Sequence, residues 1–226
     1  MKDRTAAFAL VGVMLIAVAC GDDDSTSTGT TGTTVTSGSS VPVDTSTAVW
    51  PTSDSTTRYD DPVEVATAFA TDYIGFVDPV VGAFQQGDSR SGEVEVKPAS
   101  DGPVTTILVR QLGTGDSWWV LGAATAGIQL SEPAALATIS SPVQLAGTST
   151  AFEATVQSEV RQDGDDAALG EGFVMGGSMG EMGPFDAMLA FTQPTAAYGA
   201  VMLSTLSMEN GQVWEATVIR VQFASA

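Results

Sequence analysis

The residues that most enzymes use for catalysis are scarce in this chain, which contains no histidine and a single cysteine among 226 residues. These absences exclude an imidazole base, a histidine metal site, a cysteine–histidine nucleophile and an internal disulfide. Residues 176–180 match the G-x-S-x-G pattern of a nucleophilic serine. A nucleophilic serine of this type requires a histidine and an α/β sheet around it. A lysine could replace the histidine as the base, but Lys97, the only lysine beyond the N-terminus, falls on a predicted solvent-facing strand position in the other domain. We therefore interpret residues 176–180 as a glycine-rich loop.

Two other groups of side chains have the chemistry of metal ligands. The acidic group consists of Asp163, Asp165 and Asp166. It lacks the ordered ligand series and the terminal glutamate of an EF-hand loop, so we interpret it as a solvated hairpin turn. The sulfur group consists of Met175, Met179 and Met182. No histidine or cysteine assists these thioethers in binding a soft metal, so we interpret them as core filling and a mobile loop. We expect no metal and no cofactor.

Carboxylates are the remaining candidates for catalysis, because the chain has 27 acidic and 8 basic residues. Two acids about 5–9.5 Å apart can hydrolyse a glycosidic bond without histidine. A carboxylate-dependent hydrolase of envelope glycans is therefore the alternative to the leading interpretation, which is a non-enzymatic protein. The positions of the acids along the sequence do not show which two of them come together in the fold, so no catalytic residue is predicted. The net charge of −19 repels phosphate groups, and we expect no nucleic-acid partner.

The N-terminus has the features of a secretory signal. Lys2 and Arg4 precede an apolar run of 14 residues at positions 6–19, which is shorter than the roughly 20 residues that a membrane-spanning helix needs. The run ends in AVAC at residues 17–20, which resembles the lipobox of bacterial lipoproteins. The resemblance implies a signal peptide at residues 1–19 and a lipid on the sulfur of Cys20. We therefore expect an extracytoplasmic protein that is lipid-anchored to the bacterial cell membrane.

A tether is expected after the signal. Serine and threonine make up 20 of the 37 residues from 21 to 57, and no apolar periodicity offsets the entropy of ordering them. We expect residues 20–58 to form a lipid-anchored, disordered Ser/Thr-rich tether. Trp50 and Pro51 interrupt this composition, and Trp50 either docks on the folded part or is exposed.

Residues 59–127 are predicted to form a small α+β domain. Asp61 caps a helix of about 13 residues, and Gly75 and Pro79 follow its end. The apolar stripe of this helix consists of Val65, Phe69, Tyr73 and Phe76. Strand-like segments follow at residues 94–96, 104–112 and 118–123. One helix on three antiparallel strands is the simplest packing. Trp118 and Trp119 point to opposite faces of the last strand, so one packs under the helix and the other covers a domain junction or offers a ligand platform.

Residues 128–226 are predicted to form an immunoglobulin-like β-sandwich, so the whole chain is expected to be mainly β. About seven strand-like segments are separated by turn signals that include Asp163-Gly164 and Asn210-Gly211. The segments lie at residues 128–130, 143–145, 152–161, 169–175, 185–191, 198–206 and 213–223. In the third segment, the alternation places Phe152 and Val156 in the core, whereas Glu153 and Thr155 face water.

Several motifs of this region occur in a characteristic order: ISSPVQLAG at residues 139–147, AFEATV at 151–156, GPF at 183–185 and the last strand at 214–223. Together they resemble the immunoglobulin-like domain of bacterial spore germination. The resemblance implies a β-sandwich with no established catalytic residues, in proteins that are often secreted or lipid-anchored. We expect the whole protein to work in binding or assembly through its surfaces, with a cell-wall polymer or another envelope protein as the partner.

Replacement of the predicted lipid-attachment residue tests the anchor. Cys20→Ser removes the only sulfur that can carry the lipid, so we expect the variant to leave the membrane fraction. Detergent phase partitioning followed by immunoblotting measures this change against the parent protein. Equal partitioning of the two proteins into the detergent phase would contradict the predicted anchor.

Overall fold

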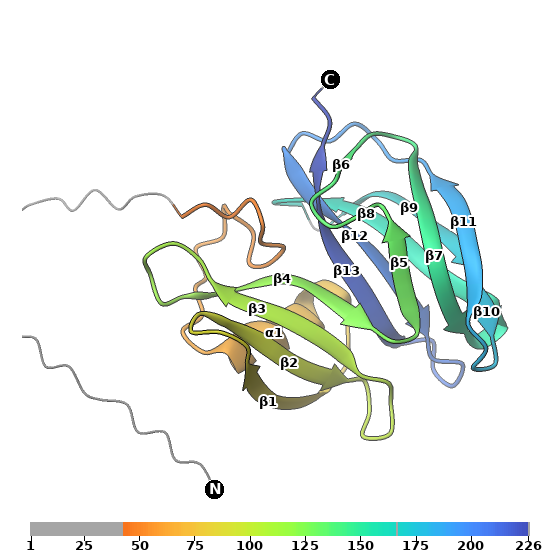
Figure 1. The fold of residues 1–226 in the computed structure, drawn as a ribbon, viewed down its shortest axis with the longest axis horizontal. Helices are drawn as coiled ribbons and strands as arrows, with labels where there is room; N and C mark the ends of the chain where they lie inside the picture. The colour runs from red at the N-terminus through yellow and green to blue at the C-terminus, as the bar shows by residue number, and fades with distance from the viewer. Residues whose placement is uncertain (1–42, 166, 226) are drawn as a thin grey trace, which may run out of the picture. The chain divides into compact units, whose positions relative to one another are not determined.

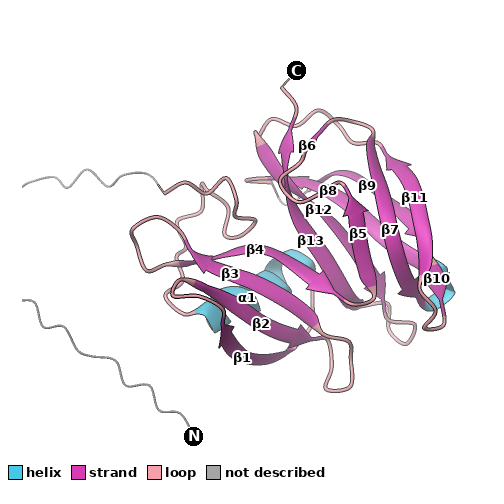
Figure 2. Cartoon of the chain, viewed as in Figure 1, coloured by secondary structure: helices cyan, strands magenta, loops and turns pink. Residues whose placement is uncertain are grey.

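The computed structural model describes residues 43–165 and 167–225 (Figure 1). The predicted signal peptide, Cys20 and residues 20–42 of the predicted tether lie outside the described residues. Within the described ranges, no helix is long and apolar enough to cross a membrane. This part of the chain is mainly β, with its principal helix near residue 62 and strands from residue 80 onward, as Figure 2 shows, so the predicted fold class is confirmed.

The helical elements are α1 (Pro62–Ala68), the π-helical turn η1 (Phe69–Ile74) and the short 3-10 turn η2 (Phe152–Ala154). The strands are β1 (Val80–Gln86), β2 (Ser91–Lys97), β3 (Thr105–Gln111), β4 (Trp118–Thr125), β5 (Ile128–Glu132), β6 (Thr138–Ile139), β7 (Val143–Ala151), β8 (Thr155–Gln162), β9 (Ala168–Met175), β10 (Gly177–Ser178), β11 (Gly183–Leu189), β12 (Tyr198–Leu206) and β13 (Val213–Phe223).

The first helix begins and ends where its sequence signals predict. The carboxylate of Asp61 accepts hydrogen bonds from the backbone N–H groups of Val63 (2.7 Å) and Glu64 (3.1 Å), which would otherwise lack partners. α1 continues directly into η1, and Gly75 ends the helix in the left-handed region with φ of 91°. The predicted 13-residue helix is therefore confirmed.

Strands β1 to β4 form an antiparallel meander under this helix. The sequence predicted three strands, but the structure adds β1 at the edge of the sheet. Most positions of β1 are exposed, and its pairing with β2 shifts register between Val81 and Phe84. An exposed and irregular edge strand has no alternation of apolar and polar residues, and this is why the pattern did not reveal it.

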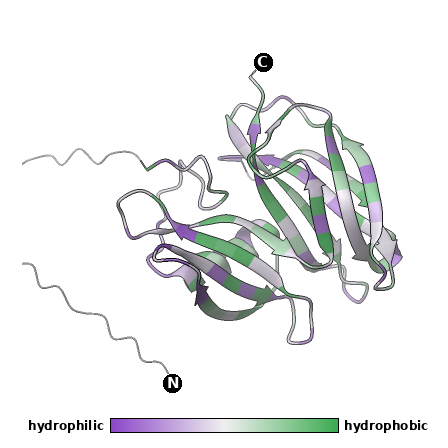
Figure 3. Ribbon diagram, in the orientation of Figure 1, coloured by the Kyte–Doolittle hydropathy of each residue, from purple (hydrophilic) through white to green (hydrophobic). Residues whose placement is uncertain are grey.

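The remaining strands form two packed layers. One layer has the strand order β13-β12-β8-β9, and the other contains β5, β7 and β11, with β10 beside β7. Apolar side chains from both layers are buried between them, and Figure 3 shows the hydrophobic and hydrophilic bands along these strands. All seven predicted strands are present, and Gly164 and Gly211 adopt the positive φ angles (74° and 72°) that their turns require.

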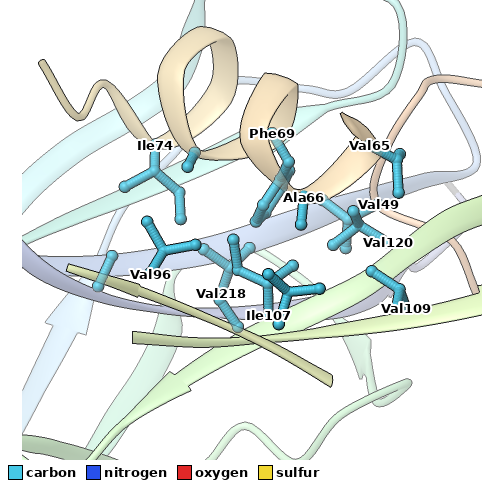
Figure 4. Close-up of a cluster of buried hydrophobic side chains, with 14 of the residues drawn as sticks. Val49, Val65, Ala66, Phe69, Ile74, Val96, Ile107, Val109, Val120 and Val218 are labelled. Atoms are coloured by element: carbon cyan, nitrogen blue, oxygen red, sulfur yellow. The ribbon is translucent and has the colours of Figure 1, made fainter. Parts of the chain in front are cut away.

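Strands β12 and β13 are buried on both faces. Val201, Leu203 and Val221 face the interior of the sandwich. Ala200, Met202, Ala216 and Val218 belong instead to a second core with the helix and the meander. Figure 4 shows Phe69 and Ile74 of the helix above Val218, Ile107 and Val96 in this second core, which we call the helix core.

The helix core joins the two predicted domains. Their boundary at residues 127 and 128 lies in the turn between β4 and β5, and Val218 of β13 pairs with Ala123 of β4. The described residues on both sides of the turn belong to one compact unit. The sandwich and the α+β segment therefore share strands β12 and β13 as a common wall.

Residues 43–58 differ from the expected tether. Ala48 and Val49 are buried, and the N–H of Val49 donates to the carbonyl of Val120 (2.8 Å) while the N–H of Val120 donates to the carbonyl of Trp50 (2.7 Å). β13 pairs with β4 only at Ala123, so the edge of β4 near Val120 is left open for this segment. Trp50 therefore docks on the folded part, because it belongs to a segment that supplies backbone partners to β4.

The prediction that Phe152 lies in the core is wrong. Phe152 is 53% exposed and lies in η2, before β8 begins. Glu153 and Ala154 have positive φ angles of 57° and 62°, which breaks the alternation of side chains at this point. The alternation starts again within β8, where Val156 and Val160 are buried in the sandwich.

Two phenylalanine variants test this assignment of the cores. Phe69 is fully buried, so Phe69→Ala should lower the free energy of unfolding by about 3–5 kcal/mol, whereas Phe152→Ala should change it by less than about 1 kcal/mol. Denaturant unfolding followed by tryptophan fluorescence and far-UV circular dichroism measures both. Because one wall is shared by both cores, the two probes should report a single transition. A smaller loss for Phe69→Ala than for Phe152→Ala would contradict the described packing.

Candidate functional site

The G-x-S-x-G segment serves backbone packing in the structure. Ser178 lies in β10, which pairs in parallel with the end of β7. A Cβ atom on Gly177 would lie 2.0 Å from the carbonyl oxygen of Glu181, so only glycine fits there. The segment is thus a close approach between loops, and Lys97 lies on β2, a strand of the meander.

The aspartates of the β8–β9 turn are held by protein groups. Both carboxylate oxygens of Asp163 accept from the guanidinium of Arg220, at 2.5 and 2.7 Å, and Arg220 is 3% exposed. Asp165 accepts from the backbone N–H of Ala167 (3.0 Å), and Asp166 lies outside the described residues. Among the residues that the structure describes, no three acidic or cysteine side chains are grouped to hold a metal ion.

The adjacent tryptophans are both covered. Trp119 is 2% exposed, and the guanidinium of Arg58 lies 4.9 Å from its ring centre. Trp118 packs against the helix core and contacts the ring of Phe84 edge-on, at 5.2 Å between centroids. The two side chains occupy opposite faces, as predicted, and neither is left open as a ligand platform.

The part of the interpretation that assigned the three methionines to core filling is wrong. Met175, Met179 and Met182 are exposed to 53%, 92% and 42% of their surface. Met179 is the most exposed of these, and it lies in the turn after β10 as part of a larger apolar group that the sequence analysis did not recognise.

This group forms an apolar surface at one end of the sandwich, which we call the apolar end. It consists of Phe152, Met179, Leu206, Met208 and Trp214. These side chains line an open cavity of about 420 Å³ together with Thr150, Ala151 and the turn that joins β12 to β13. Large exposed apolar side chains that gather around one hollow are typical of sites for binding another molecule.

Local backbone geometry presents the apolar end to solvent. The positive φ angles at Glu153 and Ala154 turn the chain directly after Phe152. Met179 also has a positive φ angle of 54°, and the N–H of Gly180 donates to the hydroxyl of Thr150 (3.1 Å). These non-glycine residues in the left-handed region hold apolar side chains outward at an energetic cost, which is a feature that is common at functional sites.

Hydrogen bonds fix the turn that carries Met208. The N–H of Ser207 donates to the carbonyl of Gln212 (2.8 Å), and the N–H of Gly211 donates to the carbonyl of Ser207 (2.8 Å). The side chain of Asn210 accepts from the N–H of Gln212 (3.0 Å). Met208 is 71% exposed on this braced turn. Its thioether can therefore adapt to a partner while its backbone stays in place.

One buried carboxylate lies in the wall of the cavity. Glu215 is 6% exposed, and its oxygens accept from the hydroxyls of Thr125 (2.5 Å) and Thr205 (3.4 Å). A Cβ atom on Gly127 would lie 2.3 Å from a Glu215 oxygen, so the β4–β5 turn packs directly against the carboxylate. The carboxylate is therefore paired within the protein and braces the wall of the cavity, while the exposed side chains around the cavity are apolar.

The two-layer antiparallel sandwich places the C-terminal half in the immunoglobulin-like class. Residues 127–212 match the family model described as the immunoglobulin-like domain of bacterial spore germination, so the predicted resemblance is confirmed for this range. The matched range stops before β13, which the sequence analysis had included. Neither the curated proteins nor the solved structures contain a match to this chain.

Methionine oxidation tests the exposure of the apolar end. Met179 and Met208 should form sulfoxides several-fold faster than Met202, because Met202 is 3% exposed in the helix core. Treatment of the folded protein with dilute hydrogen peroxide, followed by peptide mass spectrometry, gives the three rates. Similar rates would mean that the apolar end is covered or that the helix core opens readily.

Proposed function

We propose that this protein is a non-enzymatic, lipid-anchored protein of the bacterial cell envelope. Its immunoglobulin-like domain works outside the membrane in binding or assembly, and its partner is another envelope protein that contacts the apolar end. The observation that carries this proposal is the exposure of Phe152, Met179 and Met208 around one cavity. The anchor rests on the AVAC sequence at residues 17–20 and on Cys20 as the only cysteine.

The chemistry of the apolar end favours a protein partner over a small polar ligand. Aromatic and methionine side chains are enriched at protein interfaces, and thioethers adapt to partners of different shape. Thr205 and Glu215 of the cavity wall are 3% and 6% exposed and are hydrogen-bonded to each other, so the surface open to a partner is mainly apolar. A partner with an apolar projection would complement this cavity.

The alternative of a carboxylate-dependent hydrolase has one observation in its favour. Asp54, Asp72, Asp163 and Asp165 line a second cavity. Asp163 is held by Arg220 through both oxygens, so a pair of catalytic acids would have to come from the other three. Incubation of the purified protein with envelope glycans, followed by an assay for new reducing ends, would support the hydrolase if ends accumulate.

Paired methionine variants test the proposed binding surface. Met179→Ser with Met208→Ser removes two exposed apolar contacts without emptying a core, so the melting temperature should stay close to that of the parent. Truncation of two interface anchors costs about 2–4 kcal/mol of binding, which is a loss of at least tenfold in affinity. Photo-crosslinking on intact cells with a probe at position 207 measures the yield of cross-linked partner.

Met188→Ser is the matched control for these variants. Met188 is 59% exposed on β11 and does not line the apolar cavity, so its change should leave the cross-linking yield unaltered. An equal yield from the parent, the double variant and the control would show that the apolar end is not the binding surface.

A further inference from the structure

Exposed carboxylates flank the apolar end. Glu209 is part of the cavity lining, and Glu153 directly follows Phe152. Glu181 lies between β10 and β11, in the same segment as Met179. All three glutamates are exposed, and none of them forms an ion pair with another residue of the described ranges. The apolar surface therefore has a negatively charged rim.

No basic side chain of the sandwich lies near this rim. Residues 111–160 and 162–219 contain neither lysine nor arginine, and they include every residue of the apolar end. The two arginines of the sandwich, Arg161 and Arg220, both pair in register with Ala200 of β12. Ala200 lies toward the opposite end of β12 from the apolar end, about 20 Å away along the strand. Each of these arginines also has its own carboxylate partner.

The basic side chains of the meander are distant as well. Lys97 lies on β2, and β3 and β4 separate β2 from β13, so the strand spacing alone amounts to about 14 Å. Arg58 contacts the ring of Trp119, and Arg110 pairs in register with Trp119, at the opposite end of β4 from the β4–β5 turn. Arg90 donates to carbonyls of the β3–β4 turn. Exposed charges more than about 10 Å apart are largely screened by salt, so none of these cations neutralises the rim.

The charge of the rim decides between the molecules that an apolar surface can bind. A second copy of this chain that docked through the same surface would bring its own rim glutamates against these, and like charges across an interface oppose association. An anionic membrane surface would be repelled in the same way. A protein segment that carries lysine or arginine beside apolar side chains complements both the cavity and its rim.

We infer that the apolar end binds a basic, amphipathic segment of another protein. The inference rests on the proposed function, because it names the chemistry of the partner for the same surface. Apolar side chains of the segment enter the cavity that Phe152, Met179 and Met208 line, and its basic side chains lie against the glutamates of the rim. The apolar contacts supply most of the affinity, whereas the charges speed the encounter and restrict the choice of partner.

Capture of defined peptides by the purified full-length protein tests this inference. Three fluorescent peptides of equal length are added to protein that carries the photo-crosslinking probe at position 207. The first peptide combines leucine with lysine, the second has glutamate in place of lysine, and the third has serine in place of leucine. The first should cross-link at least roughly threefold more than either other peptide, and its yield should fall when the salt rises from about 50 to about 500 mM.

Each failure of this experiment has its own meaning. Equal capture of the glutamate peptide would remove the role of charge, and equal capture of the serine peptide would show attraction by net charge without the apolar end. A cross-linked product of twice the protein's mass would assign the surface to a second copy. Displacement of the first peptide by phosphatidylglycerol vesicles would assign the surface to a membrane. Any of these results, or no capture of the first peptide, would overturn the inference.

Variants of the rim locate the effect. Glu153→Gln, Glu181→Gln and Glu209→Gln together should lower capture of the first peptide at least roughly threefold. The melting temperature should not change, because these carboxylates form no ion pair within the described ranges. The matched control removes the same number of charges from exposed acids of the sandwich that do not line the cavity, namely Glu132→Gln, Glu171→Gln and Asp186→Asn. An equal loss from the control would overturn the role of the rim.

The native partner separates this inference from the proposed function. On intact cells, the rim variant should lose cross-linking to that partner, as Met179→Ser with Met208→Ser should. If the methionine variant loses the cross-link and the rim variant retains it, the apolar end remains the binding surface and only the basic character of the partner is wrong. If both variants retain it, the proposed function fails as well.

Discussion

The burial of β12 and β13 on both faces is the constraint on which the rest of the structure depends. Val201 and Leu203 on one face close the sandwich, and Ala200 and Met202 on the other face complete the helix core. A strand pair with no face in water has to be covered on each side. The helix, the meander and the second layer of the sandwich are these covers, so each depends on the same two strands.

One buried arginine connects the segment before the helix to this strand pair. Arg220 of β13 donates to the carbonyl of Ser46 (2.9 Å) and to both oxygens of Asp163, and its guanidinium lies 5.1 Å from the Tyr198 ring centre. A buried guanidinium with all these partners fixes three segments at one point, and loss of the carboxylate would leave its charge uncompensated. The same contact holds the β8–β9 turn beside the second cavity.

Sequence patterns predicted the elements whose signals are local. The cap at Asp61, the turn at Gly211 and the alternation in β8 depend on neighbouring residues, and each is present. The apolar end was missed because apolar residues in a β-rich region were assigned to the core, and only the φ angles at Glu153 and Ala154 turn Phe152 outward. Met208, an apolar residue between two turn residues, was the available signal for this surface. The second cavity joins residues from positions 49 to 165, and no local pattern reveals such long-range proximity.

The shared wall has a consequence for how such a chain can change by recombination. The short turn at Gly127 is a point where a gene segment could be joined without breaking a strand. A transferred immunoglobulin-like half would, however, carry Met202 and Val218 on a newly exposed face, which favours aggregation. Recombination at this turn is therefore tolerated only when the acceptor protein covers the exposed face of β12 and β13, or when polar residues first replace the apolar ones on that face. The part of the chain that can be transferred intact therefore begins with the segment around Trp50 that pairs with β4, and it extends through β13.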